Sequence, residues 1–227
     1  VIYTTPIKAL SNQKYNDFNE KFSESCSFGI LTGDIKANSE ADCLIMTTEI
    51  LMNYLFTSTT NTDDSESQNA LQFQIDVKND LACVVFDEVH YINDPDRGKV
   101  WEECMILMPP CITLIMLSAT IDKADEFASW IGNIKQKTTN LIPTSHRVVP
   151  LEHFFYLPDS HQQLKKIVSH NGTFQNYNEI KEEYHFVQSS KMINDFIEYL
   201  KVHTLVPALF FIFSRKECEK MALSVHK

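Results

Sequence analysis

A run of six apolar residues leads directly into two acids at Leu81-Ala82-Cys83-Val84-Val85-Phe86-Asp87-Glu88-Val89-His90. An apolar run of this length is typical of a strand that is buried on both faces of a parallel sheet. Ligands of open α/β sheets bind in the crevice at the carboxyl ends of the strands. There, one carboxylate can hold Mg²⁺, directly or through water, while its neighbour orients a water that attacks a γ-phosphate. A bare Asp-Glu pair, however, is more often an ordinary strand end with solvated acids.

Six further apolar runs of strand length occur along the chain, at residues 1–5, 28–32, 43–47, 112–117, 153–157 and 208–213. Helix-period segments lie between several of them. Two of these segments carry an apolar stripe, one made of Ile7, Leu10, Phe18 and Phe22 and the other of Met192, Phe196, Ile197 and Leu200. Continuous apolar strands that alternate with amphipathic helices predict an α/β fold with a parallel sheet covered on both faces.

The 227 residues correspond to about one and a half typical domains. We expect one nearly complete α/β unit over residues 1–143, a linker over 144–150 that ends in Pro150, and the beginning of a second unit over 151–227. Residues 57–69 contain no apolar side chain and are expected to form a solvated insertion loop. The chain begins inside a strand-like run, so we also expect a missing segment upstream of residue 1.

The composition excludes several classes of protein. Hydrophobic residues make up 44% and charged residues 22%, as in ordinary globular proteins, and no apolar run is long enough to predict a membrane span. The six cysteines include no Cys-x-x-Cys pair, which argues against a zinc site and favours a reducing, intracellular compartment. The net charge of −10 and the five glycines argue at first against a nucleic-acid or phosphate site, but residues 57–103 alone hold eleven acids and three bases.

A second polar motif strengthens the interpretation of the Asp-Glu pair. The apolar run at 112–117 ends in Ser118-Ala119-Thr120, whose hydroxyls can pass hydrogen bonds between a phosphate site and a neighbouring domain. Other motifs occur in a fixed order, at residues 5–14 (which begin Thr5-Pro6-Ile7-Lys8), 31–34, 46–51, 91–94 with 97–103, 127–132, 149–153 and 211–219. Together with Asp87-Glu88-Val89-His90, this series resembles the superkiller and exosome-cofactor branch of the DExH-box RNA helicases of superfamily two, nearly from end to end.

The resemblance implies a RecA-like parallel sheet with flanking helices, comprising most of the first helicase domain and the start of the second. It implies ATP and Mg²⁺ as cofactors. Asp87 would bind Mg²⁺ through water, Glu88 would polarise the hydrolytic water, and His90 would couple to Ser118 and Thr120. Without its neighbours, His90 would be better interpreted as a satisfied core histidine.

The same resemblance implies that single-stranded RNA is bound by Thr5, Pro6, Lys8, Gly33, Asp34, Thr47, Thr48, Glu49, Ser214 and Arg215. Backbone N–H groups, hydroxyls and the charge of Lys8 can hold a phosphate, and Gly33 permits close approach of a nucleic-acid strand. Thr47 and Thr48 can instead simply cap a helix, and the segment from Arg215 to Cys218 can equally be a helix start. Contacts of this kind follow the nucleic-acid backbone and would not discriminate base sequence.

No Gly-x-x-x-x-Gly-Lys-Ser/Thr loop and no paired-arginine motif of the helicase type occurs in the sequence. In the family, these motifs lie upstream of Thr5 and beyond Lys227, so we expect the 227 residues alone to be inactive as an ATPase. The leading hypothesis is a 3′–5′ RNA helicase of RNA degradation or surveillance. Its partners would resemble exosome or superkiller-complex proteins, a cytoplasmic location is favoured over a nuclear one, and no membrane is involved. Two alternatives are a degenerate helicase that serves as an RNA-binding scaffold and a DNA helicase of the same clan.

Overall fold

The computed structural model describes residues 1–60, 75–77, 79–144, 148–158, 161, 163–184 and 189–225. The chain divides into two compact units, Val1–Pro143 and Thr144–Lys227. The predicted linker over 144–150 begins the second unit, and residues 145–147 of it lie outside the described residues. Each unit is treated separately below.

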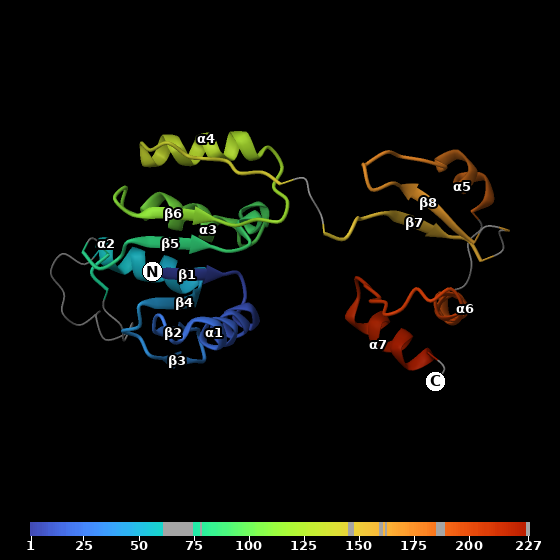
Figure 1. The fold of residues 1–227 in the computed structure, drawn as a ribbon, viewed down its shortest axis with the longest axis horizontal. Coiled ribbons are helices and arrows are strands. Elements are labelled where there is room, and N and C mark those ends of the chain that lie inside the picture. Colours follow the sequence, from blue (N-terminus) through green and yellow to red (C-terminus); the bar gives the residue numbers. More distant parts are fainter. Residues whose placement is uncertain are drawn as a thin grey trace. The chain divides into compact units, whose positions relative to one another are not determined.

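The first unit is built on a six-stranded sheet (Figure 1). Its strands are β1 (Ile2–Thr5), β2 (Phe28–Leu31), β3 (Lys36–Ala37), β4 (Cys43–Thr47), β5 (Cys83–Phe86) and β6 (Thr113–Met116). They lie in the order β3-β2-β4-β1-β5-β6, and all neighbours are parallel except the short edge pair β2 and β3. The predicted α/β fold with a parallel sheet is confirmed, and five predicted strands are found within two residues of their expected bounds.

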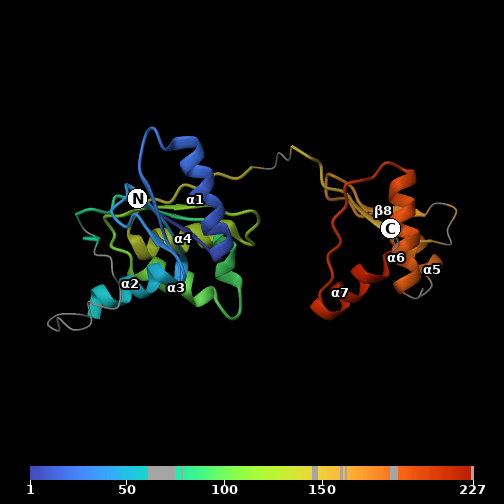
Figure 2. The same cartoon turned by 90° about the horizontal axis from the view of Figure 1, so that it is seen from below.

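Helices cover both faces of this sheet (Figure 2). One face carries α1 (Lys8–Phe22), and the opposite face carries α2 (Thr48–Thr60) and α3 (Gly98–Leu107). A 3-10 helix, η2 (Val89–Asn93), follows β5, and α4 (Ala124–Lys135) packs against α3. The connections from β1 to β2, from β4 to β5 and from β5 to β6 each place a helix over the sheet, whereas the connection from β2 to β4 contains only the short strand β3.

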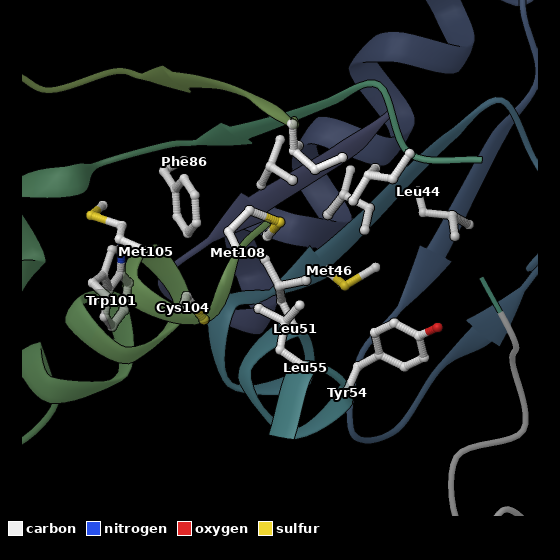
Figure 3. Close-up of a cluster of buried hydrophobic side chains, with 14 of the residues drawn as sticks. Leu44, Met46, Leu51, Tyr54, Leu55, Phe86, Trp101, Cys104, Met105 and Met108 are labelled. Atoms are coloured by element: carbon white, nitrogen blue, oxygen red, sulfur yellow. The ribbon is translucent and has the colours of Figure 1, made fainter. Parts of the chain in front are cut away.

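The larger hydrophobic core lies between the sheet and the α2–α3 face (Figure 3). Phe86 from β5, Met46 from β4 and Leu51 from α2 are almost entirely buried there, together with Trp101 and Met105 from α3. A smaller cluster on the α1 face combines Tyr3, Phe28 and Ile45 with partly buried aromatic rings of α1. Burial on both faces explains why β2 and β4 consist mainly of apolar residues, whereas the edge strand β6 is exposed at Thr113 and Ile115.

The stripe predicted for α1 is only partly correct. Ile7 is 40% and Phe22 50% exposed, whereas the one buried residue of the helix is Ser11, whose hydroxyl bonds that of Thr5. The helix starts at Lys8, with Ile7 as its N-cap. The register of α1 is therefore set by a buried polar contact that apolar periodicity does not reveal.

The predicted insertion loop over 57–69 is wrong in its first residues. Helix α2 extends to Thr60, and the Thr57 and Ser58 hydroxyls bond the carbonyls of Asn53 and Tyr54. These bonds to the preceding turn let hydroxyl residues continue a helix that composition alone predicts to end. The rest of the predicted loop lies outside the described residues.

The described residues of the second unit form an antiparallel hairpin and three helices. The elements are β7 (His153–Tyr156), β8 (Leu164–Val168), α5 (Tyr177–Glu183), α6 (Ser189–Val202) and α7 (Arg215–Ser224). Tyr156 packs on Phe196 of α6 with ring centroids 4.5 Å apart, and Ile193 and Leu200 of the same helix are buried. Met192 of the predicted stripe is exposed.

The strand predicted at Ala208–Phe213 is wrong, because this segment pairs with no described strand. Leu209 and Phe211 are each 85% exposed, and Phe213 is fully exposed. A parallel strand of this composition is stable only between neighbouring strands with both faces covered, and the hairpin β7–β8 does not provide such a position. No helix among the described residues is long and apolar enough to cross a membrane.

Candidate functional site

The parallel topology brings five predicted motifs to one edge of the sheet. Because β2, β4, β1, β5 and β6 run in the same direction, the residues that follow them all lie at the carboxyl edge. Across the sheet, these residues are, in order, Gly33 and Asp34; Thr47, Thr48 and Glu49; Thr5, Pro6 and Lys8; Asp87, Glu88 and His90; and Ser118 and Thr120. The acidic motif thus lies between the segment after β1 and the segment after β6.

Asp87 is held firmly at the end of β5. Its backbone N–H donates to the carbonyl of Thr4, and its side chain is only 13% exposed. The Tyr3 hydroxyl donates to Asp87 Oδ2 at 2.8 Å, and Lys14 Nζ of α1 lies 3.4 Å from the same oxygen. Burial, together with the hydrogen bond to Asp87, raises the pKa of Tyr3 well above its ordinary value, so this hydroxyl remains a donor.

Glu88 and His90 turn away from the strand. Glu88 has φ of 53°, a left-handed conformation that non-glycine residues adopt rarely and often at functional sites. His90 Nδ1 lies 3.3 Å from Glu88 Oε2 and 3.4 Å from Ser118 Oγ. The structure therefore brings three predicted residues together, whereas Thr120 lies exposed two residues beyond Ser118.

The acidic motif fits a magnesium ion that keeps several of its waters. Magnesium is usually bound through one or two carboxylates plus substrate phosphates, and the described residues contain no cluster of three or more acidic, histidine or cysteine side chains that would ligate a metal on their own. Asp87 keeps one carboxylate oxygen clear of the Tyr3 and Lys14 contacts, since both reach Oδ2. The only hydrogen bond found at Oδ1 comes from the backbone N–H of Glu88, among the described residues.

The hydroxyls of Thr5 and Thr48, two of the residues predicted to contact RNA, are hydrogen-bonded inside the protein. Thr5 Oγ1 lies 2.7 Å from Ser11 Oγ, and Thr48 Oγ1 donates to the carbonyl of Thr5 at 3.4 Å. Thr5 and Thr48 are fully buried and Thr47 is 7% exposed. In this conformation, these hydroxyls join the segment after β1 to the start of α2, which makes them supports of the edge.

The charged and flexible positions are more accessible. Lys8 Nζ pairs with Asp34 Oδ2 at 2.5 Å, and the two side chains are 52% and 71% exposed. A Cβ on Gly33 would lie 3.1 Å from the same Lys8 Nζ. The segments after β1 and β2 are therefore linked by an exposed ion pair, which a competing phosphate can displace because such pairs are weak in water.

Arg97 is the site residue that sequence reasoning missed. Its guanidinium donates to the Glu49 carboxylate, with the Nε contact at 3.2 Å, and to the carbonyl of Pro6. Tyr3 and Lys14 were missed as partners of Asp87 in the same way. The sequence signal for Arg97 is its place in the motif 97–103, which follows the acidic motif.

Comparisons with known proteins agree with this arrangement. Residues 1–127 match the family model described as DEAD/DEAH box helicase. The chain belongs to the DEAD/DEAH box helicase family. The matched residues include every candidate site residue of the first unit, whereas Ser214 and Arg215 lie outside the match.

Individual relatives within the helicase family are long proteins. Mouse superkiller complex protein 2 is 38% identical over 97% of this chain, which corresponds to 18% of that protein. The antiviral helicase SKI2 of Saccharomyces cerevisiae is 44% identical over 76% of the chain and 12% of its own length. Human exosome RNA helicase MTR4 is 34% identical over the whole chain and 22% of its own length. The chain thus spans about a fifth or less of these relatives.

Ser214 and Arg215, in the second unit of this helicase-family chain, begin helix α7. The Ser214 hydroxyl accepts a hydrogen bond from the Glu217 N–H at 3.4 Å, as an N-cap residue does. The structure therefore supports the capping interpretation of Ser214. Arg215 is exposed at the first position of the helix.

Proposed function

We propose that the protein containing this chain is an ATP-dependent RNA helicase that moves 3′ to 5′ along single-stranded RNA in degradation or surveillance. The observation that carries the proposal is the carboxyl edge of the sheet, where Asp87 and Glu88 lie between the motif after β1 and Ser118 after β6. Similarity to superkiller and exosome helicases supports RNA rather than DNA as the nucleic acid. Residues 1–143 would form the first RecA-like domain, 144–150 the linker, and 151–227 the start of the second.

In this proposal, the acidic motif performs the ATP chemistry. Asp87 would hold Mg²⁺ through water, and Glu88 would polarise the water that attacks the γ-phosphate of ATP. When bound, Mg²⁺ would neutralise charge on the phosphates. The fixed orientation of Asp87 by Tyr3 and by the Thr4 carbonyl favours this role. His90 would couple to Ser118 and Thr120, and the 3.4 Å approach of His90 Nδ1 to Ser118 Oγ supports the first of these links.

The other half of the edge would follow the RNA backbone. The accessible groups there are Lys8 and the backbone around Pro6, Gly33 and Asp34. Beside them, Thr47, Thr48 and Glu49 would form the end of β4 and the start of α2. Ser214 and Arg215 would add contacts from the second domain. The proposal includes partners like those of the superkiller complex or the exosome, which similarity to superkiller and exosome helicases supports, and a cytoplasmic rather than nuclear location.

The decisive experiment is Glu88→Gln in the complete protein. The change removes the negative charge that polarises water but keeps the size of the side chain, so we expect loss of RNA-stimulated ATPase with nucleotide binding retained. Glu102→Gln on the exposed face of α3 is the matched control and should leave both unchanged. Unchanged turnover in Glu88→Gln would show that Glu88 is misassigned.

The wild-type protein in the same assay separates the proposal from its two alternatives. RNA binding without any ATPase would indicate a degenerate helicase that acts as a scaffold. That alternative rests on the absence of a Gly-x-x-x-x-Gly-Lys-Ser/Thr loop and of the paired-arginine motif from these 227 residues. Stimulation by single-stranded DNA but not by RNA would indicate a DNA helicase.

A further inference from the structure

The side chain of Arg97 joins three segments of the candidate site. Its guanidinium donates to the Glu49 carboxylate in the first turn of α2 and to the carbonyl of Pro6 after β1. It also lies over the rings of Tyr91 in η2 and Trp101 in α3, with its central carbon 5.9 Å and 5.7 Å from the ring centroids. Thus one side chain contacts the segments that follow β1, β4 and β5.

The turn before α3 presents Arg97 in a fixed direction. Asp94 Oδ1 accepts a hydrogen bond from the Arg97 N–H at 2.9 Å, and the Asp94 carbonyl accepts one from the Gly98 N–H at 2.8 Å. Below the guanidinium, the rings of Tyr91 and Trp101 stack 5.7 Å apart at 25°, and Trp101 is fully buried. The backbone of Arg97 and its ring platform, the stacked rings of Tyr91 and Trp101, are therefore both held in place, although the Arg97 side chain itself is 35% exposed.

These contacts require an arginine. A guanidinium carries five donors in a planar fork, so it can bond a carboxylate and a carbonyl at once while its flat face rests on aromatic rings. A lysine offers a single ammonium on a flexible stem and cannot make the same set of contacts. Replacing Arg97 by lysine therefore preserves the charge but breaks the connection between Pro6 and the ring platform.

We infer that Arg97 is a positioning residue that couples the RNA-binding segments after β1 and β4 to the ATPase motif after β5. The inference rests on the proposed function, because it links the proposed RNA-binding segments to the proposed ATPase motif. The platform begins at Tyr91, next to His90, so a displacement of Pro6 or Glu49 on RNA binding reaches the acidic motif through Arg97. Interactions that join two sites in this way typically alter their coupling by about 2- to 30-fold.

The test uses Arg97→Met and Arg97→Lys in the complete protein, with Lys99→Met as control. Lys99 is 81% exposed, two positions further on, and pairs only with Glu103 of its own helix among the described residues. ATPase is measured with and without single-stranded RNA over a range of RNA concentrations. We expect the ratio of stimulated to basal rate to fall about 2- to 30-fold in both Arg97 variants, with a higher RNA concentration at half-stimulation, and no change in Lys99→Met.

The ratio of RNA-stimulated to basal ATPase rate distinguishes a positioning role of Arg97 from a merely structural one. Loss of folded protein lowers both rates in proportion and leaves the ratio and the half-stimulating RNA concentration unchanged, so a proportional fall overturns the inference. If Arg97→Met does not fold, Arg97→Lys decides, and a wild-type ratio in that variant also overturns it. A wild-type protein that RNA fails to stimulate would instead remove the proposed function itself.

Discussion

Gly98 is the position where the smallest side chain should have a large effect on stability. A Cβ added there would lie 2.2 Å from the carbonyl oxygen of Ile92 and 2.8 Å from its carbon, whereas ordinary contacts begin near 3.4 Å. The obstacle is backbone, so the turn that follows η2 must move by about 1 Å. Forcing an extra methyl group into a packed site costs about 1–3 kcal/mol, and a backbone obstacle belongs at the upper end of this range. The lower entropy of the unfolded alanine chain offsets about 0.4–1 kcal/mol. We therefore expect Gly98→Ala to lower the free energy of unfolding by about 2 kcal/mol.

Tryptophan fluorescence during urea unfolding measures this effect selectively. The two tryptophans of the chain, Trp101 and Trp130, both lie in the first unit, so their signal reports that unit. Gly33→Ala is the matched control, because its new Cβ would meet only the flexible end of Lys8, at 3.1 Å. We expect the control to change the free energy of unfolding by less than about 0.5 kcal/mol, as surface substitutions usually do. If Gly98→Ala unfolded at the same urea concentration as the control, the close approach of Ile92 would not constrain the turn, and the reasoning would be refuted.

Two further predictions concern buried titratable groups of the first unit. Burial lowers the pKa of Lys135, whose ammonium donates to the carbonyl of Met108, so the unfolded state binds more protons between the two pKa values and stability should rise with pH there. Urea titrations from about pH 8 to about pH 10.5 should show this rise in the wild type and its loss in Lys135→Met; parallel pH profiles would contradict it. Burial also raises the pKa of the Cys104 thiol, so iodoacetamide should label the exposed Cys111 and Cys218 in the folded chain and reach Cys104 only after unfolding, as mass spectrometry of the modified peptides can establish.

The sequence was sufficient to predict five of the six strands of the first sheet because each of the five coincides with an apolar run, whereas the two-residue strand β3 does not. Such strands are continuous apolar runs, and each run ends where polar residues begin, as Phe86 gives way to Asp87. The edge that gathers the motifs follows from parallel pairing alone. The contact between His90 and Ser118 was expected only from the family resemblance, and the structure brings these two side chains to 3.4 Å.

The failures have a common physical cause, which is dependence on specific partners that apolar periodicity does not reveal, several of them distant in sequence. The apolar run at Ala208–Phe213 has strand composition, but a strand exists only when a neighbour accepts its hydrogen bonds, and no described strand does so. Ser11 of α1 is buried because its hydroxyl contacts that of Thr5, whereas apolar periodicity treats Ser11 as an exposed position. The contacts of Tyr3 with Asp87 and of Arg97 with Pro6 span 84 and 91 residues of sequence. None of these pairings is encoded in local spacing.

The strand order also explains why the couplings converge on β1. The proposed RNA segments follow β2, β4 and β1, and the proposed ATPase segments follow β5 and β6, so the border between the two halves of the edge runs between β1 and β5. Two contacts cross this border. The Tyr3 hydroxyl, within β1, donates to Asp87, and the Pro6 carbonyl, just after β1, accepts a hydrogen bond from Arg97. A shift of residues 5–8 relative to β5 must strain at least one of these contacts. Signals between the two halves are therefore expected to pass through the β1–β5 border, and substitutions on the short edge strand β3, three positions from β1 in the sheet, should leave them unaffected.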